Sequence, residues 1–433
     1  MQVENEKARA EGRAFTFVDA FAGCGGLSLG LMRAGWIGHF AIEKDRFAFE
    51  TLRENFLGPR ARYSYRWPDW LEQRPWAVED LLSNHLHDLK ELRGKVDLLA
   101  GGPPCQGFSS AGRRRAVDPR NELVERYLEL VDIIRPKIVL MENVLGITYD
   151  FKVNGKRGKP VPNFANKLKE RLSSEYHVVC STLRACEFGV PQQRPRFFLV
   201  AISKTQNLDS LLNTFFDELR KASPSFLSKR NIPRRVAART AISDLEVGRN
   251  GTVPCPDSNG YVSIAYGQPR SNFQRAMRDG HEGPPSDTRL AKHRPEIEHR
   301  FKRIISLCHA KGRLNVQLSR EMRQKFGLKK MATRVLDPEQ PAPTITSMPD
   351  DLLHYSEPRT LTVRENARLQ TFPDWFVFKG KYTTGGEMRR REVPRFTQVA
   401  NAVPPLLAEL IGEVLCANMR EAARPEERSR QAA

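Results

Sequence analysis

The sequence contains few cysteines and no long apolar run. Its 433 residues include 7 cysteines, which are scattered along the chain without a Cys-x-x-Cys pair. The spacings of a zinc site or a disulfide framework are therefore missing, and reduced thiols are expected. No stretch approaches the roughly eighteen consecutive apolar residues of a membrane span, and the N-terminus lacks the apolar segment of a signal peptide. We expect an intracellular protein with no membrane partner.

Acidic residues are scarce relative to basic ones. The chain has 51 Asp and Glu against 70 Lys and Arg, which gives a formal net charge of +19. The imbalance is strongest between residues 301 and 334, where ten Lys or Arg face a single acid, Glu321. Cations that bind phosphates release condensed counterions. A nucleic acid is therefore the expected partner, and a basic solvated surface is the plainer alternative.

Apolar runs and helical patterns alternate over the first half of the chain. We predict strands at 15–20, 36–42, 96–100, 137–141, 176–183 and 196–202. We predict helices at 76–92, 121–134, 361–369 and 404–418, with Thr362 and Glu365 in capping-box spacing at the start of the third. This alternation is typical of a doubly wound α/β sheet. The rhythm stops after residue 203, and the Pro-, Gly-, Ser- and Arg-rich sequence that follows predicts a second lobe.

A glycine-rich turn joins the first strand to the first helix. Gly23, Gly25 and Gly26 stand between them, an arrangement with which α/β folds hold the polar part of a nucleotide-like cofactor. The dinucleotide fingerprint is incomplete, because Ser28 occupies the place of its third glycine. Glu43, about 20 residues after the turn, ends the second strand and is well placed to accept from ribose hydroxyls. A tight connection and a solvated carboxylate are the alternatives.

The third strand leads into the sequence Gly-Gly-Pro-Pro-Cys at 101–105. Two glycines permit unusual backbone angles and two prolines fix φ, so Cys105 is delivered at the carboxyl end of a strand, where open α/β sheets bind ligands. A thiol there is a candidate nucleophile, although an isolated cysteine is more often a buried apolar side chain.

Two further groups are expected in the same crevice. Glu142 ends the fourth strand. Arg194 and Arg196 stand two apart on a segment predicted to be extended, so their side chains should point to the same side. They could hold a carbonyl oxygen or a phosphate in two hydrogen bonds, or form a plain surface pair.

Five blocks, in their order, resemble the DNA (cytosine-5)-methyltransferases of bacterial restriction–modification type. They are Asp-Ala-Phe-Ala-Gly-Cys-Gly-Gly at 19–26, Gly-Pro-Pro-Cys-Gln-Gly-Phe-Ser at 102–109, Glu-Asn-Val at 142–144, Gln-x-Arg-x-Arg at 192–196 and Gln-Val-Ala-Asn-Ala-Val-Pro-Pro at 398–405. The stretch 364–374 also resembles the family, and the resemblance covers about 15–420 except the middle lobe. Two positions depart from the family pattern: Ala400 replaces a glycine, and Asp88 follows His87 instead of a glycine.

The resemblance implies a Rossmann-like, S-adenosylmethionine-dependent methyltransferase fold with an inserted, smaller and irregular target-recognition domain. The implied domains are a catalytic domain at 15–245 that resumes at 358–420, a DNA-reading domain at 246–357, and disordered tails at 1–14 and 421–433. S-adenosylmethionine would be the methyl donor, and no metal is implied. The implied cofactor-binding residues are Phe21, Gly23, Cys24, Gly25, Gly26, Glu43, Asp88, Pro103 and Asn401.

The resemblance also implies the chemistry, which is methylation of C5 of a cytosine in a specific double-stranded DNA sequence. Cys105 would add to C6 of a flipped-out base, and Glu142 would share or donate a proton at N3. Arg194 and Arg196 would orient Glu142 or stabilise O2, and the loop 106–120 would close over the base. The expected protein is a monomer in the bacterial cytoplasm, associated with the nucleoid, that protects host DNA; a cognate restriction endonuclease is left open.

Three alternatives remain. A tRNA cytosine-5 methyltransferase uses the same scaffold, but that family has Pro-Pro-Cys-Gln-Pro-Phe and a Cys-Phe-Thr, whereas this chain has Gly107 and no Cys-Phe-Thr. A catalytically silent DNA-binding relative is disfavoured by the intact set of Cys105, Glu142 and the two arginines. A cysteine hydrolase is disfavoured because no histidine stands in a recognisable block.

Overall fold

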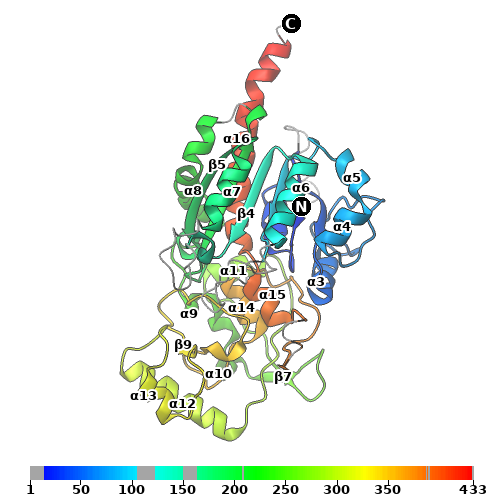
Figure 1. Ribbon diagram of the computed structural model, residues 1–433. Helices are drawn as coiled ribbons and strands as arrows, with labels where there is room; N and C mark the ends of the chain where they lie inside the picture. The colour runs from blue at the N-terminus through cyan, green and yellow to red at the C-terminus, as the bar shows by residue number, and fades with distance from the viewer. Residues whose placement is uncertain are drawn as a thin grey trace, which may run out of the picture. The chain divides into compact units, whose positions relative to one another are not determined.

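The computed structural model describes residues 14–104, 122–149, 163–206, 209–386, 388 and 391–431 (Figure 1). The chain divides into two units. The first unit comprises Met1–Arg184, Pro195–Ser223 and Leu407–Ala433, and the second comprises Ala185–Arg194 and Pro224–Leu406. The predicted DNA-reading segment, 246–357, lies inside the second unit, and so does most of the predicted return to the catalytic domain. The functional assignment of these segments stays a prediction.

Six strands form the sheet of the first unit. They are β1 (Thr16–Ala20), β2 (Ile37–Ile42), β3 (Leu98–Gly101), β4 (Ile138–Asn143), β5 (Tyr176–Arg184) and β6 (Pro195–Ser203). Their order is β2-β1-β3-β4-β6-β5, in which β6 runs antiparallel to both of its neighbours and the other pairs are parallel. The predicted α/β fold is confirmed, and each predicted strand overlaps an observed one.

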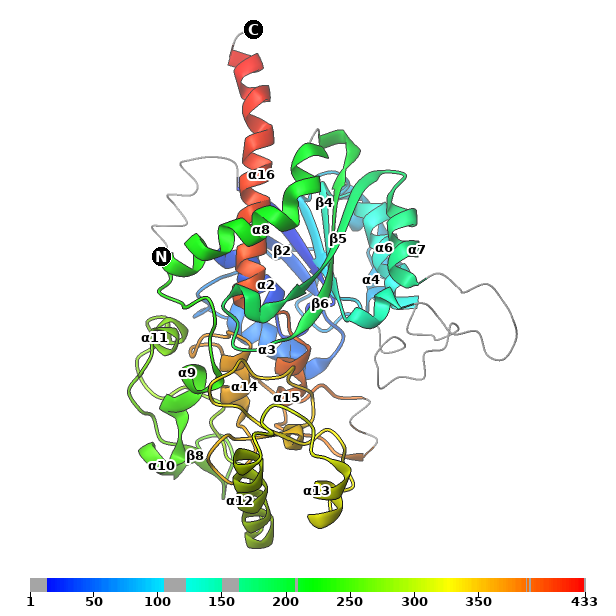
Figure 2. The same cartoon turned by 90° about the vertical axis from the view of Figure 1, so that its left-hand side faces the viewer.

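Helices cover both faces of this sheet. They are α2 (Gly26–Arg33), α3 (Arg46–Phe56), α4 (Val78–Asn84), α5 (Leu86–Glu91), α6 (Glu122–Ile134), α7 (Phe164–Leu172), α8 (Asp209–Lys229), which ends in the second unit, and α16 (Pro405–Gln431), with 3-10 turns η2 (Leu145–Thr148) and η4 (Lys204–Gln206). Figure 2 shows α6 and α7 on one side of the sheet and α16 on the other. The helix predicted at 76–92 is divided at His85, whose backbone is not helical (φ −125°, ψ 26°).

The parallel strands end in register along one edge of the sheet. Ile42 pairs with Ala20, Ala20 pairs with Gly101, and Gly101 pairs with Met141. Phe21, Glu43 and Gly102 therefore leave the sheet at the same edge, and Glu142 follows Met141 there while still paired with Phe198 of β6. This register brings together the glycine turn, Glu43, the turn that begins at Gly102, and Glu142.

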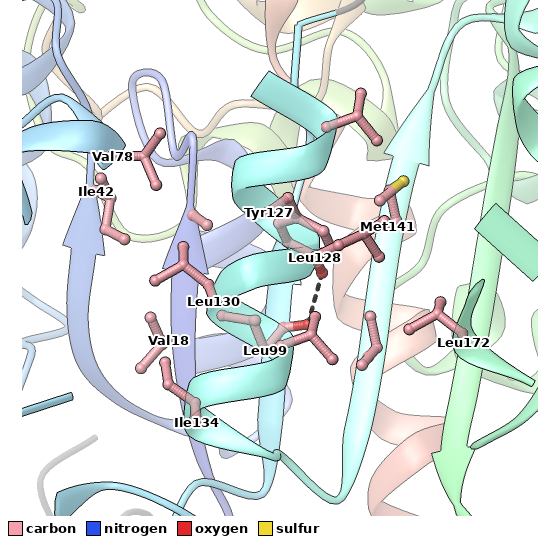
Figure 3. Close-up of a cluster of buried hydrophobic side chains, with 14 of the residues drawn as sticks. Val18, Ile42, Val78, Leu99, Tyr127, Leu128, Leu130, Ile134, Met141 and Leu172 are labelled. Atoms are coloured by element: carbon pink, nitrogen blue, oxygen red, sulfur yellow. Dashed lines mark hydrogen bonds between the residues drawn. The ribbon is translucent and has the colours of Figure 1, made fainter. Parts of the chain in front are cut away.

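The core between α6 and the sheet is apolar (Figure 3). Leu99 and Val139 of the central strands and Leu130 of α6 are fully buried. Tyr127 is the polar exception, because its hydroxyl donates to the carbonyls of Leu99 (3.0 Å) and Leu140 (3.2 Å). Those bonds satisfy the buried hydroxyl and tie α6 to β3 and β4, the two strands that lead into the predicted catalytic residues.

Helix α16 packs closely on the opposite face. A Cβ atom added at Gly412 would lie 2.7 Å from the Cβ of Ala34, so the glycine allows the close approach. The indole of Trp36 donates to the Gly412 carbonyl at 3.0 Å, and Arg33 pairs with Glu409 at 2.9 Å. The helix continues to Gln431, whereas we predicted a disordered tail from 421; the residues there are mostly good helix formers.

One stretch of the described residues, Arg395–Glu421, is long and apolar enough by composition to cross a membrane, with a mean hydropathy of 1.5 in its most apolar 18-residue window. However, 83% of its most apolar window is buried inside the protein. Burial of this kind is typical of a core helix.

The second unit has little regular sheet. Its described elements are η3 (Ala185–Phe188), α9 (Ala238–Ile242), η5 (Ser243–Leu245), α10 (Val247–Asn250), β7 (Thr252–Pro254), β8 (Val262–Ile264), α11 (Asn272–Arg278), α12 (Pro295–Ala310), α13 (Arg320–Lys325), β9 (Arg334–Val335), η6 (Pro349–Asp351), β10 (Leu352–Leu353), α14 (Val363–Leu369) and α15 (Arg395–Asn401). The predicted capping box at the start of α14 is confirmed, because Thr362 and Glu365 exchange both of its hydrogen bonds. A small apolar cluster joins α12, α13, β9 and β10.

Candidate active site

The glycine turn after β1 has a left-handed backbone at three positions. Phe21, Gly23 and Gly25 have φ values of 60°, 58° and 90°. A Cβ at Gly25 would lie 2.5 Å from the Phe56 ring, whereas a Cβ at Gly23 would meet nothing within 4 Å. One side of the turn is therefore packed and another is open. A left-handed backbone costs a residue such as Phe21 about 1–3 kcal/mol, and such strain gathers at functional sites.

Glu43 is bonded directly to this turn. The Gly23 N–H donates to Oε2 of Glu43 at 2.9 Å, and the Asp45 N–H donates to Oε1 at 2.7 Å. Burial raises the pKa of Glu43 to about 7, although the two backbone donors oppose the shift. Each carboxylate oxygen keeps a further lone pair, so the group can accept from a ligand while it holds the turn.

A buried series of hydrogen bonds links the glycine turn to the strand before it, and the sequence analysis did not predict this series. The Tyr65 hydroxyl donates to Oγ of Ser28 at 2.6 Å, and Ser28 donates in turn to the carboxylate of Asp19. Burial raises the pKa of Asp19 to about 7, and the nearby Glu43 carboxylate adds to the rise. The available signal was Ser28 itself, the residue that interrupts the glycine pattern.

Asp88 lies on α5 and is linked to Glu43 through two intervening residues, His85 and Trp76. Its carboxylate contacts Nδ1 of His85 at 3.2 Å, and the His85 ring lies 5.1 Å from the ring of Trp76. The backbone N–H of Trp76 donates to the backbone carbonyl of Glu43 at 2.9 Å. The structure therefore brings Asp88 near the segment around Glu43, with its side chain partly exposed.

The turn that begins at Gly102 contacts the end of β4. A Cβ at Gly102 would lie 3.4 Å from Oε2 of Glu142. The side chain of Asn143 donates to the Pro103 carbonyl at 3.2 Å and accepts from the Val144 N–H at 2.8 Å. Cys105 and the predicted closing loop at 106–120 lie outside the described residues. The described turn that precedes Cys105 therefore lies beside Glu142.

Glu142 forms an ion pair with Arg196. The Nε of Arg196 lies 3.0 Å from Oε1 of Glu142, and both side chains are largely buried. Within the part of the chain that the structure describes, no donor meets Oε1 with the alignment of a hydrogen bond. Arg196 also donates to the Pro195 carbonyl at 2.8 Å. The pair therefore keeps hydrogen-bonding capacity for another group.

Arg194 has a different environment from the one its spacing predicted. Its φ is 25°, so the segment is not extended there and the argument that Arg194 and Arg196 share a side does not hold. Its guanidinium is buried and donates to the carbonyls of Ala400 (2.8 Å), Asn401 (3.3 Å) and Ala402 (2.9 Å). Asn401, the last residue of α15, is exposed.

Cys24 stands within the glycine turn but is buried, with 1% of its surface exposed. Burial raises the pKa of its thiol to about 12, which leaves it protonated and unreactive near neutral pH. Among the described residues, no group of three or more His, Cys, Asp or Glu is arranged to hold a metal ion. The expectation that the reaction needs no metal stays a prediction.

Two groups of polar side chains thus stand along one sheet edge. One consists of the glycine turn with Glu43, and the other of Glu142, Arg196 and the turn that leads to Cys105. A glycine turn and polar side chains at the carboxyl ends of the strands are typical of an α/β enzyme that binds a nucleotide-like cofactor. This is the class of enzyme that the fold and the site define.

Comparison with known proteins specifies the family. The model of the C-5 cytosine-specific DNA methylase family matches residues 15–417, and the chain belongs to that family. The protein is a C-5 cytosine DNA methyltransferase. The predicted family is thereby confirmed.

Individual relatives agree. The type II methyltransferase M.DdeI of Desulfomicrobium norvegicum is 31% identical over 405 residues, which cover 92% of this chain and 87% of that protein. The type II methyltransferase M1.HphI of Haemophilus parahaemolyticus is 30% identical over 407 residues, which cover 93% and 87%. A solved E. coli structure described as a DNA modification methyltransferase encoded within a prophage has a TM-score of 0.61 and 24% identity, covers 94% of this chain and is itself covered completely (100%); it supports the fold.

Proposed function

We propose that this enzyme methylates C5 of a flipped-out cytosine in a specific double-stranded DNA sequence, through a temporary bond between Cys105 and C6. The proposal rests on one observation. The Glu142–Arg196 pair lies beside the turn that precedes Cys105, at one edge of the sheet. The matched relatives are type II methyltransferases, so we also propose a role in protecting host DNA.

S-adenosylmethionine would supply a methyl group activated by its sulfonium. The residues present fit such a ligand, because Gly23 has open space beside it and Glu43 keeps acceptor capacity. Glu43 would accept from the ribose hydroxyls, Phe21 would pack on the adenosine, and the amides of 23–26 would meet the methionine end. Asp88, Pro103 and Asn401 stay proposed contacts. Cys24, whose thiol is buried, would contribute only its backbone.

The cytosine chemistry needs a nucleophile and a donor. The Cys105 thiolate adds to C6, which turns C5 into a nucleophile and pushes charge onto N3 and O2. Glu142 donates or shares a proton at N3, and Arg196 orients Glu142 or stabilises O2. C5 then takes the methyl group, a base (which we infer to be water) removes the C5 proton, the thiolate leaves with the electron pair of its bond to C6, and N3 returns its proton to Glu142. The methyl donor departs as the thioether.

Access to C5 and C6 requires the base to leave the stack, at a cost of a few kcal/mol. The segment 246–357, with its excess of cations, is the proposed reader of bases in the major groove. We also propose that the enzyme acts as a monomer, that it associates with the nucleoid, and that it has a cognate endonuclease.

Replacing the nucleophile tests the proposal. We expect Cys105→Ala to abolish methyl transfer to duplex DNA while DNA binding survives, and Cys180→Ala, at an exposed cysteine, to leave both unchanged. Bisulfite sequencing of DNA from expressing cells would reveal the target, and tritiated-methyl transfer to duplex DNA and to tRNA would separate the two substrate classes. Turnover by Cys105→Ala would refute the covalent route.

The cofactor assignment has a separate test. We expect Glu43→Ala to weaken S-adenosylmethionine binding by roughly tenfold or more, the loss of one charge-assisted hydrogen bond, with DNA affinity little changed. Glu50→Ala, at a surface carboxylate paired with Arg46, is the matched control. Equal losses of cofactor and DNA affinity in calorimetric titrations of Glu43→Ala would count against the assignment.

A further inference from the structure

The helices α12 and α13 of the second unit share a small apolar core (Figure 1). The apolar side chains of α12 recur on one side of the helix and pack with those of α13, β9 and β10. The buried members of this core on the two helices are Phe301, Ile304, Ile305, Cys308, Met322 and Phe326. Because a helix has 3.6 residues per turn, burial of this side leaves Lys302 and Arg303 on the outer side, where both are exposed.

The outer side of this helix pair carries a basic surface. Six of the ten Lys and Arg between 301 and 334 are exposed, namely Lys302, Arg303, Lys311, Arg320, Lys325 and Lys329. At a rise of about 1.5 Å per helical residue, Lys302 and Lys311 lie roughly 14 Å apart along the axis. Each strand of a duplex carries one phosphate per about 3.4 Å. The basic surface is therefore long enough to contact several phosphates.

Acidic partners for these cations are scarce. In the described part of the chain, Lys330 is the one cation of the ten that pairs with carboxylates, those of Asp350 and Asp351 at 2.6 Å each. On α3 and α6 of the first unit, by contrast, exposed arginines pair with acids one turn away. Surface charges of both signs are normally interspersed. A group of cations without acids repels itself, and a polyanion relieves that repulsion.

The residue types of the basic surface suit phosphate better than a base. Four of its six cations are lysines, and an ammonium on a flexible stem acts as a point charge with little demand on geometry. Selection of a base requires donors and acceptors held in a fixed pattern. Phosphate contacts position a protein on DNA but carry no direct sequence information.

We propose that the basic surface of α12 and α13 binds backbone phosphates of duplex DNA without reading sequence, and that base selection falls to other parts of 246–357. The inference rests on the proposed function, in which that segment contacts DNA. It separates two contributions within the segment. The basic surface supplies affinity that depends on salt, and the remainder supplies discrimination between sequences.

Neutralising the lysines of the basic surface tests this role. The variant combines Lys302→Gln, Lys311→Gln, Lys325→Gln and Lys329→Gln, which keep side-chain length and helix propensity. Binding is measured over a series of salt concentrations on two duplexes, one with the sequence that is methylated in expressing cells and one with that sequence scrambled. We expect the slope of log K against log salt to become shallower by about 0.9 per lost contact, or about 3 to 4 in total. Both duplexes should lose affinity by the same factor, roughly tenfold or more.

The control variant removes the same charge from the first unit. It combines Lys90→Gln, Lys95→Gln, Lys167→Gln and Lys169→Gln, all at exposed lysines. Lys95 precedes β3 (Leu98–Gly101) and so lies toward the edge of the sheet opposite to Glu43 and Glu142. The control should keep most of the salt slope. In both variants, single-turnover methyl transfer at saturating DNA should stay within about twofold of the wild type.

Three results would overturn the inference. They are an unchanged salt slope in the basic-surface variant, an equal change of slope in the control, and a loss of affinity confined to the duplex with the target sequence. A wild-type protein that transfers no methyl group to duplex DNA would instead overturn the proposed function.

Discussion

The two units of the chain differ in the kind of side chain that is buried inside each of them. In the first unit, strands such as β3 and β4 are buried among leucine, valine and isoleucine, and α6 adds one satisfied hydroxyl. In the second unit, the largest fully buried side chains are arginines, namely Arg194, Arg364 and Arg368. Their partners are buried acids or backbone carbonyls.

Apolar side chains and buried arginines specify the fold of a unit in different ways. Apolar burial is non-directional and grows with area, so the first unit tolerates a range of apolar side chains. A buried guanidinium must have its donors matched, because an unmatched buried charge is costly. Arg368 meets Asp374 at 2.5 Å and Asp244 at 3.1 Å, and these partners lie 6 and 124 residues away in sequence. The second unit thus adds directional contacts of buried arginines to its apolar clusters.

The largest expected effect comes from breaking one such contact. Arg368→Met leaves Asp244 and Asp374 buried without their cation, which should lower the free energy of unfolding by about 3–5 kcal/mol. Chemical denaturation followed by fluorescence measures it. Lys381→Met, which removes an ammonium paired with Glu392 at the surface, should cost at most about 1 kcal/mol. Similar losses for both variants would show that burial is not what distinguishes Arg368.

A core substitution in the first unit should have a comparable or smaller effect. Leu99→Ala removes a fully buried side chain between α6 and the sheet, which should cost about 2–5 kcal/mol through lost burial and a cavity. Leu99→Met should cost less than about 1.5 kcal/mol, because it keeps the volume. Equal losses for the two would contradict an apolar, non-directional core.

Asp19, a buried carboxylate of the first unit, should give the stability a pH dependence. Burial raises the pKa of Asp19 from 3.8 to about 7, so between these values the folded protein keeps a proton that the unfolded chain releases. The contribution of Asp19 to the free energy of unfolding should fall as pH rises from about 4 to about 7, by at most about 1.4 kcal/mol per pH unit. Asp19→Asn should reduce the slope, and the slope left includes the contributions of Glu43 and Asp244, whose pKa values are raised by burial as well. An unaltered slope would refute this origin.

The smallest effect is expected at the surface. Arg46 and Glu50 pair at 2.8 Å one helical turn apart, with 80% of the arginine side chain exposed. Arg46→Ala should change stability by no more than about 0.5 kcal/mol, since solvent screens the pair. A loss above about 1 kcal/mol would mean that directional pairs matter in the first unit as well.

The same contrast explains what could be predicted. The strands of the first unit were readable because each is a short apolar run, and the capping box at Thr362 because its two residues stand three apart. The partners of Arg368 and Arg194 were not readable, since nothing local connects residue 194 with 400–402. The break at His85 and the length of α16 were missed because helical patterns continue through both.

For the site, the sequence predicted the residues better than their roles. The register of β1–β4 brings Glu43 and Glu142 to one edge, as expected of strand ends. Asn143 and the Asp19–Ser28–Tyr65 chain were not singled out, because their function depends on contacts across the sheet. The resemblance gave Arg194 a role beside the cytosine, and the left-handed backbone of Arg194 removes only the supporting argument from spacing.

The central claim is the temporary bond between Cys105 and the base, and a duplex with 5-fluorocytosine at the target position tests it directly. Fluorine at C5 replaces the proton that must leave, so elimination stops after methyl transfer. With S-adenosylmethionine present, mass spectrometry should find an equimolar protein–DNA adduct whose modified peptide contains Cys105. Methylation of ordinary duplex DNA with no adduct on the fluorinated one, or an adduct on another cysteine, would contradict the account.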